Sequence, residues 1–177
     1  MRLLILTGAS GSGKTAIAGA IRTGRPDLAE VLHFDSIGVP SAEVRQAWGP
    51  DGAWQREMTL AWMARIAAMR AAHHQVLFEG QMRLAFVRAG LHAAGIADAR
   101  VILVDCDDET RRHRLVTERR QPELANPEMM NWAAYLRREA KAAGCDVLNT
   151  SEVSLEHSVA QICAYLAPPS SALSCRT

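Results

Sequence analysis

The sequence predicts an α/β protein of three layers, αβα, with a five-stranded parallel sheet between helices. The pattern of apolar residues along the chain favours this class. Short runs rich in leucine, isoleucine and valine alternate along the chain with longer segments of helical periodicity. Strands that alternate with helices form parallel sheets with right-handed crossovers, and strands covered on both faces are apolar throughout. Because 177 residues suffice for one buried core, we expect a single domain over residues 1–167.

The apolar runs place the strands at residues 3–6, 29–34, 74–80, 99–106 and 145–150. A first helix follows residue 13 and ends near Gly24. Further helices are expected over 55–72 and 83–93, from Asp107 to about residue 118, from Asn126 to near Gly144, and after Ser154, with Asp107, Asn126 and Ser154 as N-caps. Trp54, Met58 and Trp62 recur every four residues, which predicts a buried helix face.

Residues 8–15 fit the phosphate-binding pattern G-x-x-x-x-G-K-[ST] at every fixed position, and they lie between a predicted strand and a predicted helix. Loop N–H groups and the helix N-terminus would bind phosphates, Lys14 would reach the β- and γ-phosphates, and the Thr15 hydroxyl would bind Mg²⁺. The alternative is a flexible turn between two core elements. The predicted nucleotide-binding residues of this loop are Gly8, Ala9, Ser10, Gly11, Ser12, Gly13, Lys14 and Thr15.

The composition of the chain disfavours several classes of binding partner. A net charge of +1 disfavours nucleic acid, whose binders usually carry a clear basic excess. No apolar run is long enough for a membrane span or a signal peptide, so we expect a cytoplasmic protein, monomeric or homodimeric. The four cysteines lack metal-ligand spacing and are expected to be reduced thiols. Residues 168–177 are expected to be disordered.

Ligands of parallel α/β sheets bind at the carboxyl ends of the strands. Asp35 follows the strand 29–34 and is the candidate base that accepts a hydroxyl proton, although with Ser36 it would also suit the cap of a turn. His33 is interpreted as a packed strand residue. Glu79 ends the strand 74–80, where a carboxylate would hold Mg²⁺ through water or contact the substrate. Arg83 would bind the acceptor or remain solvated at a helix start.

An arginine-rich run follows the strand 99–106 and leads into a segment with two prolines. In a phosphate-binding protein we interpret residues 117–128 as a lid whose arginines stabilise the transferred phosphoryl group, although such a run can also be a solvated face. Arg119 and Arg120 are the catalytic candidates, and Arg112 and Arg114 the candidates near the nucleotide base. The other candidates are Thr150 and Ser151 at the base and Trp48 as a wall of the acceptor pocket.

The loop at 8–15, Asp35, the strand end FEGQMR and the arginine-rich lid together resemble the small P-loop kinases, which include adenylate, shikimate and gluconate kinases. The stretch HFDS with the tryptophan-containing insert after it looks closest to chloramphenicol phosphotransferase-like proteins. The resemblance covers about residues 1–167 and implies the sheet order 2-3-1-4-5. Gly38 stands where adenylate kinases have the arginine of an Asp-x-x-Arg arrangement, whereas Arg83 resembles their monophosphate-binding arginine.

These features predict Mg²⁺-dependent transfer of the ATP γ-phosphoryl group to a hydroxyl of a small molecule, with Asp35 as base. The alternatives are a nucleoside monophosphate kinase and a P-loop NTPase or NTP-binding regulator without an acceptor. The sequence names neither the acceptor nor the preference for ATP over GTP.

Overall fold

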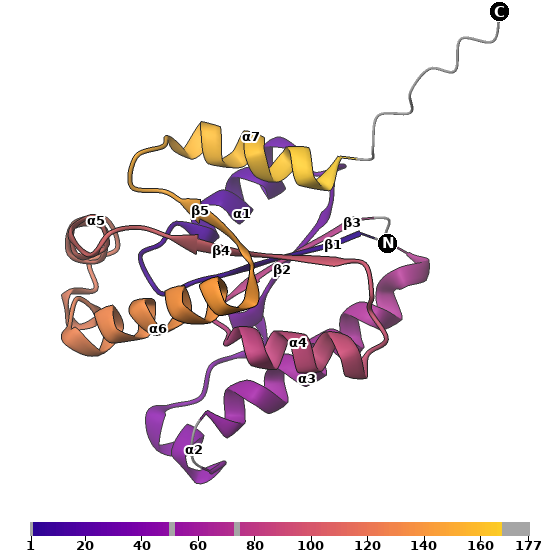
Figure 1. Ribbon diagram of the computed structural model, residues 1–177, viewed down its shortest axis with the longest axis horizontal. Coiled ribbons are helices and arrows are strands. Elements are labelled where there is room, and N and C mark those ends of the chain that lie inside the picture. The colour runs from indigo at the N-terminus through magenta and orange to yellow at the C-terminus, as the bar shows by residue number, and fades with distance from the viewer. Residues whose placement is uncertain (1, 50–51, 73–74, 168–177) are drawn as a thin grey trace, which may run out of the picture.

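The computed structural model of the chain describes residues 2–49, 52–72 and 75–167, and its centre is a parallel sheet (Figure 1). The strands are β1 (Arg2–Thr7), β2 (Glu30–His33), β3 (Gln75–Gly80), β4 (Ala99–Asp105) and β5 (Asp146–Asn149). They pair in the order β2-β3-β1-β4-β5, and every pairing is parallel. The predicted fold class and strand order are therefore confirmed.

Helices cover both faces of this sheet. On one face lie α1 (Lys14–Gly24) and α7 (Leu155–Leu166), and on the other α3 (Ala53–Ala68), α4 (Leu84–Ala93) and α6 (Pro127–Ala143) (Figure 1). The short helix α5 (Asp108–His113) follows the carboxyl end of β4, and α2 (Ala42–Ala47) lies outside the layers near α3. Short 3₁₀ segments occupy Phe34–Ile37, Met69–Ala71 and Pro122–Leu124.

The central strand shows why the strands are apolar at consecutive positions. Successive side chains of a strand point to opposite faces. In β1, Leu4 and Leu6 pack in the core beneath α1 and α7, whereas Leu3 and Ile5 pack in the core beneath α3 and α4. All four are at most 2% exposed. Burial on both faces stiffens the strand that leads into the phosphate loop.

The predicted caps are confirmed, because the side chains of Asp107, Asn126 and Ser154 accept hydrogen bonds from the backbone N–H groups three residues ahead. Trp54 and Trp62 are buried and Met58 packs against the same cluster, as predicted. These positions follow from local pattern alone, because capping and helical periodicity act within a few residues.

Three segments differ from the expectation. The helix from Asp107 is α-helical only to His113 and continues as a π-turn over Arg114–Glu118. The strand predicted at 29–34 ends at His33, and Phe34 and Asp35 begin a 3₁₀ turn. Helix α2 was not predicted, because six residues are too few to show a helical period. The predicted disordered tail, residues 168–177, lies outside the described part of the chain.

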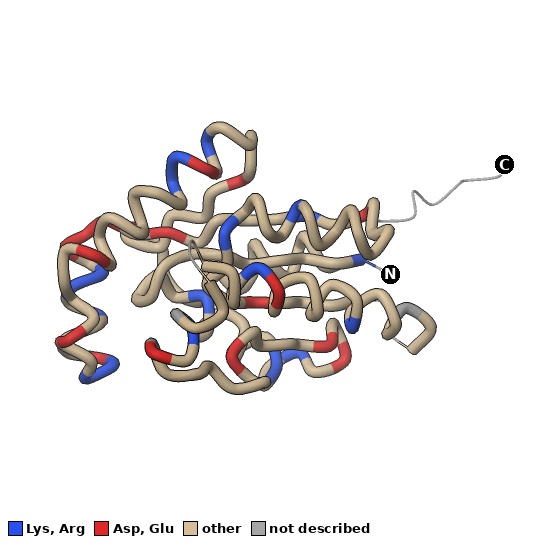
Figure 2. Tube along the Cα trace, turned by 90° about the horizontal axis from the view of Figure 1, so that it is seen from below, with Lys and Arg blue, Asp and Glu red and all other residues tan. Residues whose placement is uncertain are grey.

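Basic and acidic residues are interspersed over the trace (Figure 2). Within residues 2–49, 52–72 and 75–167, none of the helices combines the length and the apolar character that crossing a bilayer requires. Cys106, Cys145 and Cys163 are free thiols.

Candidate active site

The phosphate loop joins β1 to α1, in the strand–loop–helix context that its sequence pattern requires. Gly8 is needed for close packing, because a Cβ there would lie 2.1 Å from the carbonyl oxygen of Val104. Gly13 is the N-cap of α1 in the left-handed region, at φ 95°. These two glycines let the chain turn sharply from the centre of the sheet into a helix whose N-terminus carries unpaired N–H groups.

Side chains from other parts of the chain donate hydrogen bonds to three successive carbonyl groups of this loop. The carbonyl oxygen of Ser10 accepts from Arg111 Nη1 at 2.8 Å, and that of Gly11 accepts from Arg114 Nη1 at 3.4 Å. The carbonyl oxygen of Ser12 accepts from Thr150 Oγ1 at 2.9 Å.

These three hydrogen bonds to carbonyl groups, here called tethers, also orient the N–H groups of the loop, because the peptide group is planar and trans. In each peptide group the N–H points away from the C=O, so the tethers direct the N–H groups that follow Ser10 and Ser12 toward the opposite, phosphate-binding side of the loop. The N–H of Ser12 donates to the carbonyl oxygen of Ala9 at 3.3 Å and closes the turn. The cradle is therefore held in shape by residues more than 90 positions away in the sequence.

Arg111 is fully buried, and its charge is balanced by Asp105 at the end of β4, with Nη2 2.6 Å from Oδ1. Asp105 also pairs with Arg137 of α6. A buried ion pair is costly to break because the remaining charge is left without a partner. The network thus joins β4, α5, α6 and the phosphate loop in one rigid unit.

Lys14 stands at the start of α1 and is only 7% exposed. Its Nζ donates to the carbonyl oxygen of Ala9 at 3.0 Å and to Ser12 Oγ at 3.4 Å. Burial of the ammonium group lowers the pKa of Lys14 to about 8, with Glu79 opposing the shift and Arg111 adding to it. A phosphate anion in the loop would favour the charged form.

Thr15 and Glu79 lie together, although 64 positions separate them in sequence. Thr15 Oγ1 donates to Glu79 Oε1 at 3.3 Å. His33, in register with Glu79 across β2 and β3, places Nδ1 2.8 Å from the same carboxylate oxygen. A hydroxyl and a buried carboxylate beside a phosphate loop fit Mg²⁺, which prefers oxygen ligands and usually binds one or two carboxylates together with substrate phosphates. In the described ranges, His, Cys, Asp and Glu form no group of three or more able to hold a metal without such phosphates.

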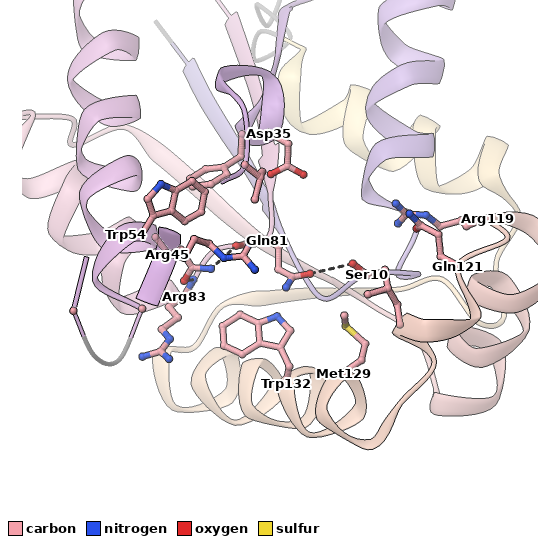
Figure 3. A pocket seen from close by; sticks show the side chains of 16 residues that line it. Ser10, Asp35, Arg45, Trp54, Gln81, Arg83, Arg119, Gln121, Met129 and Trp132 are labelled. Carbon is pink, nitrogen blue, oxygen red and sulfur yellow. Dashed lines mark hydrogen bonds between the residues drawn. The ribbon is translucent and has the colours of Figure 1, made fainter. Parts of the chain in front are cut away.

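Asp35 lies in the 3₁₀ turn after β2, and its side chain projects into a cleft (Figure 3). The turn is closed by backbone groups, since Gly38 N–H donates to the Asp35 carbonyl oxygen. Partial desolvation and the nearby charge of Glu79 raise the pKa of the Asp35 carboxyl. The N-cap of this turn is His33, whose side chain makes no capping hydrogen bond.

The cleft has a volume of about 1050 Å³ and opens beside the phosphate loop. It is bounded by the 3₁₀ turn, α3, the end of β3, the 119–124 segment and α6 (Figure 3). Its lining residues are Ser10, Phe34, Asp35, Val39, Arg45, Gly49, Gly52, Trp54, Gln55, Gln81, Arg83, Arg119, Gln121, Leu124, Met129 and Trp132.

Arg83 precedes α4 and faces aromatic rings. Its Cζ lies 5.4 Å from the ring centroid of Phe86, 5.8 Å from that of Trp132 and 5.5 Å from that of Tyr135. The ion pairs seen in the described ranges do not include Arg83. A guanidinium on the wall of a cleft is suited to binding an anionic group.

The structure brings together the phosphate loop, Thr15, Glu79, Asp35, Arg83 and Arg119. Four other sequence-predicted residues do not line the cleft. Trp48 is 48% exposed, Arg112 and Arg120 are exposed, and Ser151 Oγ accepts from the backbone N–H of Asp107. Thr150 and Arg114 contact the phosphate loop and each other.

Several residues of the site were not singled out from the sequence. Arg111 belongs to the arginine run, but only its burial distinguishes it from its neighbours. Trp132 and Gln121 enter the cleft from α6 and from the segment before it. His33, interpreted as a packed strand residue, hydrogen-bonds Glu79. The sequence held one signal for this hydrogen bond, because it places both His33 and Glu79 at the carboxyl ends of predicted strands.

No protein-family model and no curated protein matches this sequence. Solved structures do match. A sugar kinase from a Janibacter species is 16% identical, with a TM-score of 0.71 and 94% of each chain covered. A gluconokinase from Sinorhizobium meliloti is 14% identical, with a TM-score of 0.62, 93% of this chain and 91% of the other covered. A shikimate kinase from Acinetobacter baumannii is 16% identical, with a TM-score of 0.61 and coverage of 92% and 90%.

These likenesses show that the chain shares the fold of P-loop kinases. The resemblance to chloramphenicol phosphotransferase-like proteins stays a prediction.

The tethers of the loop carbonyls predict the effect of Thr150→Val, which keeps the side-chain shape but removes the hydroxyl that donates to Ser12. We expect the dissociation constant for Mg-ATP to rise about fivefold, because the loop N–H groups lose part of their fixed orientation and the loss of one hydrogen bond is worth about 1 kcal/mol. Isothermal titration calorimetry measures this constant. Thr59→Val is the matched control, since Thr59 is equally buried but its hydroxyl donates to Gln55 within α3. Equal ATP affinities in the two variants would contradict the prediction.

The lowered pKa of Lys14 predicts how ATP binding depends on pH. ATP is an anion and favours the charged lysine, so binding should weaken as the pH rises through about 8, the value at which free Lys14 loses its proton. Below that pH Lys14 is already charged and the affinity should level off. Calorimetry at pH 8 to 9 in buffers of different ionisation enthalpy should show net proton uptake. Lys14→Arg stays charged and should flatten the profile, whereas an identical pH dependence in that variant would refute the assignment.

Proposed function

We propose that this chain is an ATP-dependent kinase that transfers the γ-phosphoryl group to a hydroxyl of a small-molecule acceptor. The observation that carries the proposal is the position of Asp35, whose carboxyl projects into the cleft that Ser10 of the phosphate loop and Arg119 also line. A carboxylate at the mouth of an anion site is electrostatically costly unless a metal ion or the chemistry uses it.

In this proposal each group has one role. The acceptor oxygen attacks the γ-phosphorus, the bond from that phosphorus to the β–γ bridging oxygen breaks, and ADP leaves. The hydroxyl proton passes to the Asp35 carboxylate. Lys14 and the loop N–H groups bind the phosphates, and Thr15 and Glu79 would hold Mg²⁺, which supplies charge neutralisation on the β- and γ-phosphates.

The two adjacent arginines of the lid segment receive different roles. Arg119 lines the cleft, and its charge acts on Lys14 and Asp35, which supports a role at the transferred phosphoryl group. Both arginines are exposed, but Arg120 has φ 53° and does not line the cleft. We therefore assign transition-state stabilisation to Arg119.

A second candidate function rests on Arg83. This guanidinium lines the acceptor side of the cleft and has no carboxylate partner among the described ion pairs. An acceptor that is itself a phosphate, as in a nucleoside monophosphate kinase, would use it. Such an acceptor is already anionic and needs no base, so the raised pKa of Asp35 favours the hydroxyl acceptor.

Asp35→Asn tests the proposed base. The assay measures ADP release from Mg-ATP with a panel of sugars, sugar acids, nucleosides, aromatic alcohols and nucleoside monophosphates. We expect a hydroxyl compound of this panel to stimulate the release. In the variant the stimulated rate should fall by about 10²–10⁴-fold, while the affinity for ATP is unchanged. The wild-type rate should rise with pH on the acid side, because the base must be ionised. Asp98→Asn, an exposed carboxylate outside this cleft, is the control. Stimulation only by a nucleoside monophosphate would favour the second candidate. ADP release that needs no acceptor and is the same in the wild type and in Asp35→Asn would indicate an NTPase.

The lid arginines give an independent prediction. Arg119→Ala should lower kcat by about 10²–10³-fold with little change in ATP affinity, because its charge is used mainly in the transition state. For Arg120→Ala, one residue away, the loss of kcat should be at least tenfold smaller, because Arg120 lies farther from the charge that develops in the transition state. Steady-state kinetics of ADP release measure both. Equal losses in the two variants would contradict the assignment.

A further inference from the structure

Three neutral polar side chains of the cleft lining, Ser10, Gln55 and Gln81, bond to other groups of the protein. Gln55 Nε2 donates to the carbonyl oxygen of Gln81 at 2.8 Å, and its Oε1 accepts from the backbone N–H of Arg83. Ser10 Oγ donates to Gln81 Oε1 at 3.2 Å. The hydrogen-bonding capacity of these side chains is therefore largely used within the protein. A polyol, which presents hydroxyls on every side, would have to compete with these bonds, and of the neutral amide oxygens in the lining only Gln121 Oε1 is buried without a partner among the described residues.

The remaining wall is apolar and rigid. Trp54 of α3 packs edge-on against Phe34, with ring centroids 5.8 Å apart. Trp132 of α6 is stacked on Tyr135, with centroids 5.3 Å apart and planes inclined by 14°. Met129 lies one helical turn before Trp132 on the same wall (Figure 3). Rings fixed by such packing offer a large contact area at little entropic cost on binding.

Besides Gln121 Oε1, one further buried polar atom of the cleft lining lacks a partner among the described residues. Within the described residues Trp132 Nε1 has no hydrogen-bond acceptor, although it is shielded from water. Such a donor costs about 1–3 kcal/mol, and a ligand oxygen seated beside the indole would remove this cost. In Figure 3 the indole projects from α6 toward the hydrogen bond between Ser10 and Gln81, at the floor of the cleft.

We propose that the acceptor is a compound with a flat apolar ring and not a polyol. Its reacting hydroxyl lies at Asp35, its ring lies against Trp54, Met129 and Trp132, and a carbonyl, ether or carboxylate oxygen on the ring accepts from Trp132 N–H. This inference rests on the proposed kinase function, because the location of the hydroxyl follows from the role of Asp35. It differs from the substrates named for the sugar kinase, gluconokinase and shikimate kinase that share the fold.

The test measures binding without ATP, so that it is independent of turnover. Saturation-transfer NMR is recorded on the full chain with two panels of hydroxyl compounds of similar mass. One panel holds sugars, polyols and sugar acids such as gluconate. The other holds ring-bearing alcohols with an oxygen substituent, such as hydroxymethyl benzoates, nucleosides and aryl diol amides. Dissociation constants of the compounds that bind are then measured with Trp132→Ala and with Trp132→Phe, which keeps a ring but removes the N–H.

The expected result is binding by members of the ring-bearing panel, weakened about tenfold or more by Trp132→Ala. Trp132→Phe should cause a smaller loss, limited to compounds whose ring carries an oxygen acceptor. Val147→Ala, an exposed apolar residue on β5 away from the cleft, should change nothing. Circular dichroism confirms that the variants are folded.

Three results would each overturn the inference. They are binding confined to the polyol panel, no binding by the ring-bearing panel, and ring-bearing compounds whose affinity ignores Trp132→Ala. A failure of the kinase proposal would look different, because it would leave ADP release without any acceptor stimulation whatever the binding panel shows.

Discussion

The buried ion pair between Arg111 and Asp105 is the interaction on which the position of the phosphate loop depends. One guanidinium neutralises the carboxylate at the end of β4 and also donates to the phosphate loop at Ser10. Two charges removed from water are stable only when each is paired and hydrogen-bonded. The loop is thus fixed to the sheet edge by groups whose displacement would leave an unpaired charge, and its N–H groups are oriented before a phosphate arrives. A site organised in advance loses little free energy to rearrangement on binding.

The two halves of the site differ in chemistry for a physical reason. On the side of the phosphate loop, Lys14 and Glu79 are buried, Thr15 is exposed, and their hydrogen-bond partners are also polar. Across the cleft, the lining includes indole and thioether side chains, and Ser10, Gln55 and Gln81 bond to other groups of the protein, whereas Gln121 Oε1 has no partner among the described residues. Asp35 stands between the halves. Its raised pKa reflects this border position, with partial desolvation on one side and the charge of Glu79 on the other.

The helix geometry of the arginine-rich segment decides which part of the site each arginine contacts. Arg119 N–H donates to the carbonyl oxygen of Arg114, an i→i+5 bond that makes the turn wider than an α-turn. On an α-helix, residues five apart point in clearly different directions, whereas in a π-turn they lie near the same face. Arg114 can therefore contact the phosphate loop while Arg119 lines the cleft. Arg120, at a positive φ, begins the next turn away from it. We would not expect α-helical periodicity to separate these roles.

Pattern and spacing determined the α/β class, the five strands, the caps at Asp107, Asn126 and Ser154, and the candidate residues from Gly8 to Thr15 together with Asp35, Glu79 and Arg83. Each of these follows from local rules: capping and periodicity act over a few residues, the loop motif is contiguous, and strand ends of a parallel sheet share one edge. Only the tertiary structure decided that Arg111 is buried and holds the loop, that Thr150 and Arg114 contact its carbonyls, that His33 bonds Glu79, and that Trp132 rather than Trp48 lines the cleft. These contacts join residues far apart in the chain, and similar arginines or tryptophans differ only in what packs around them.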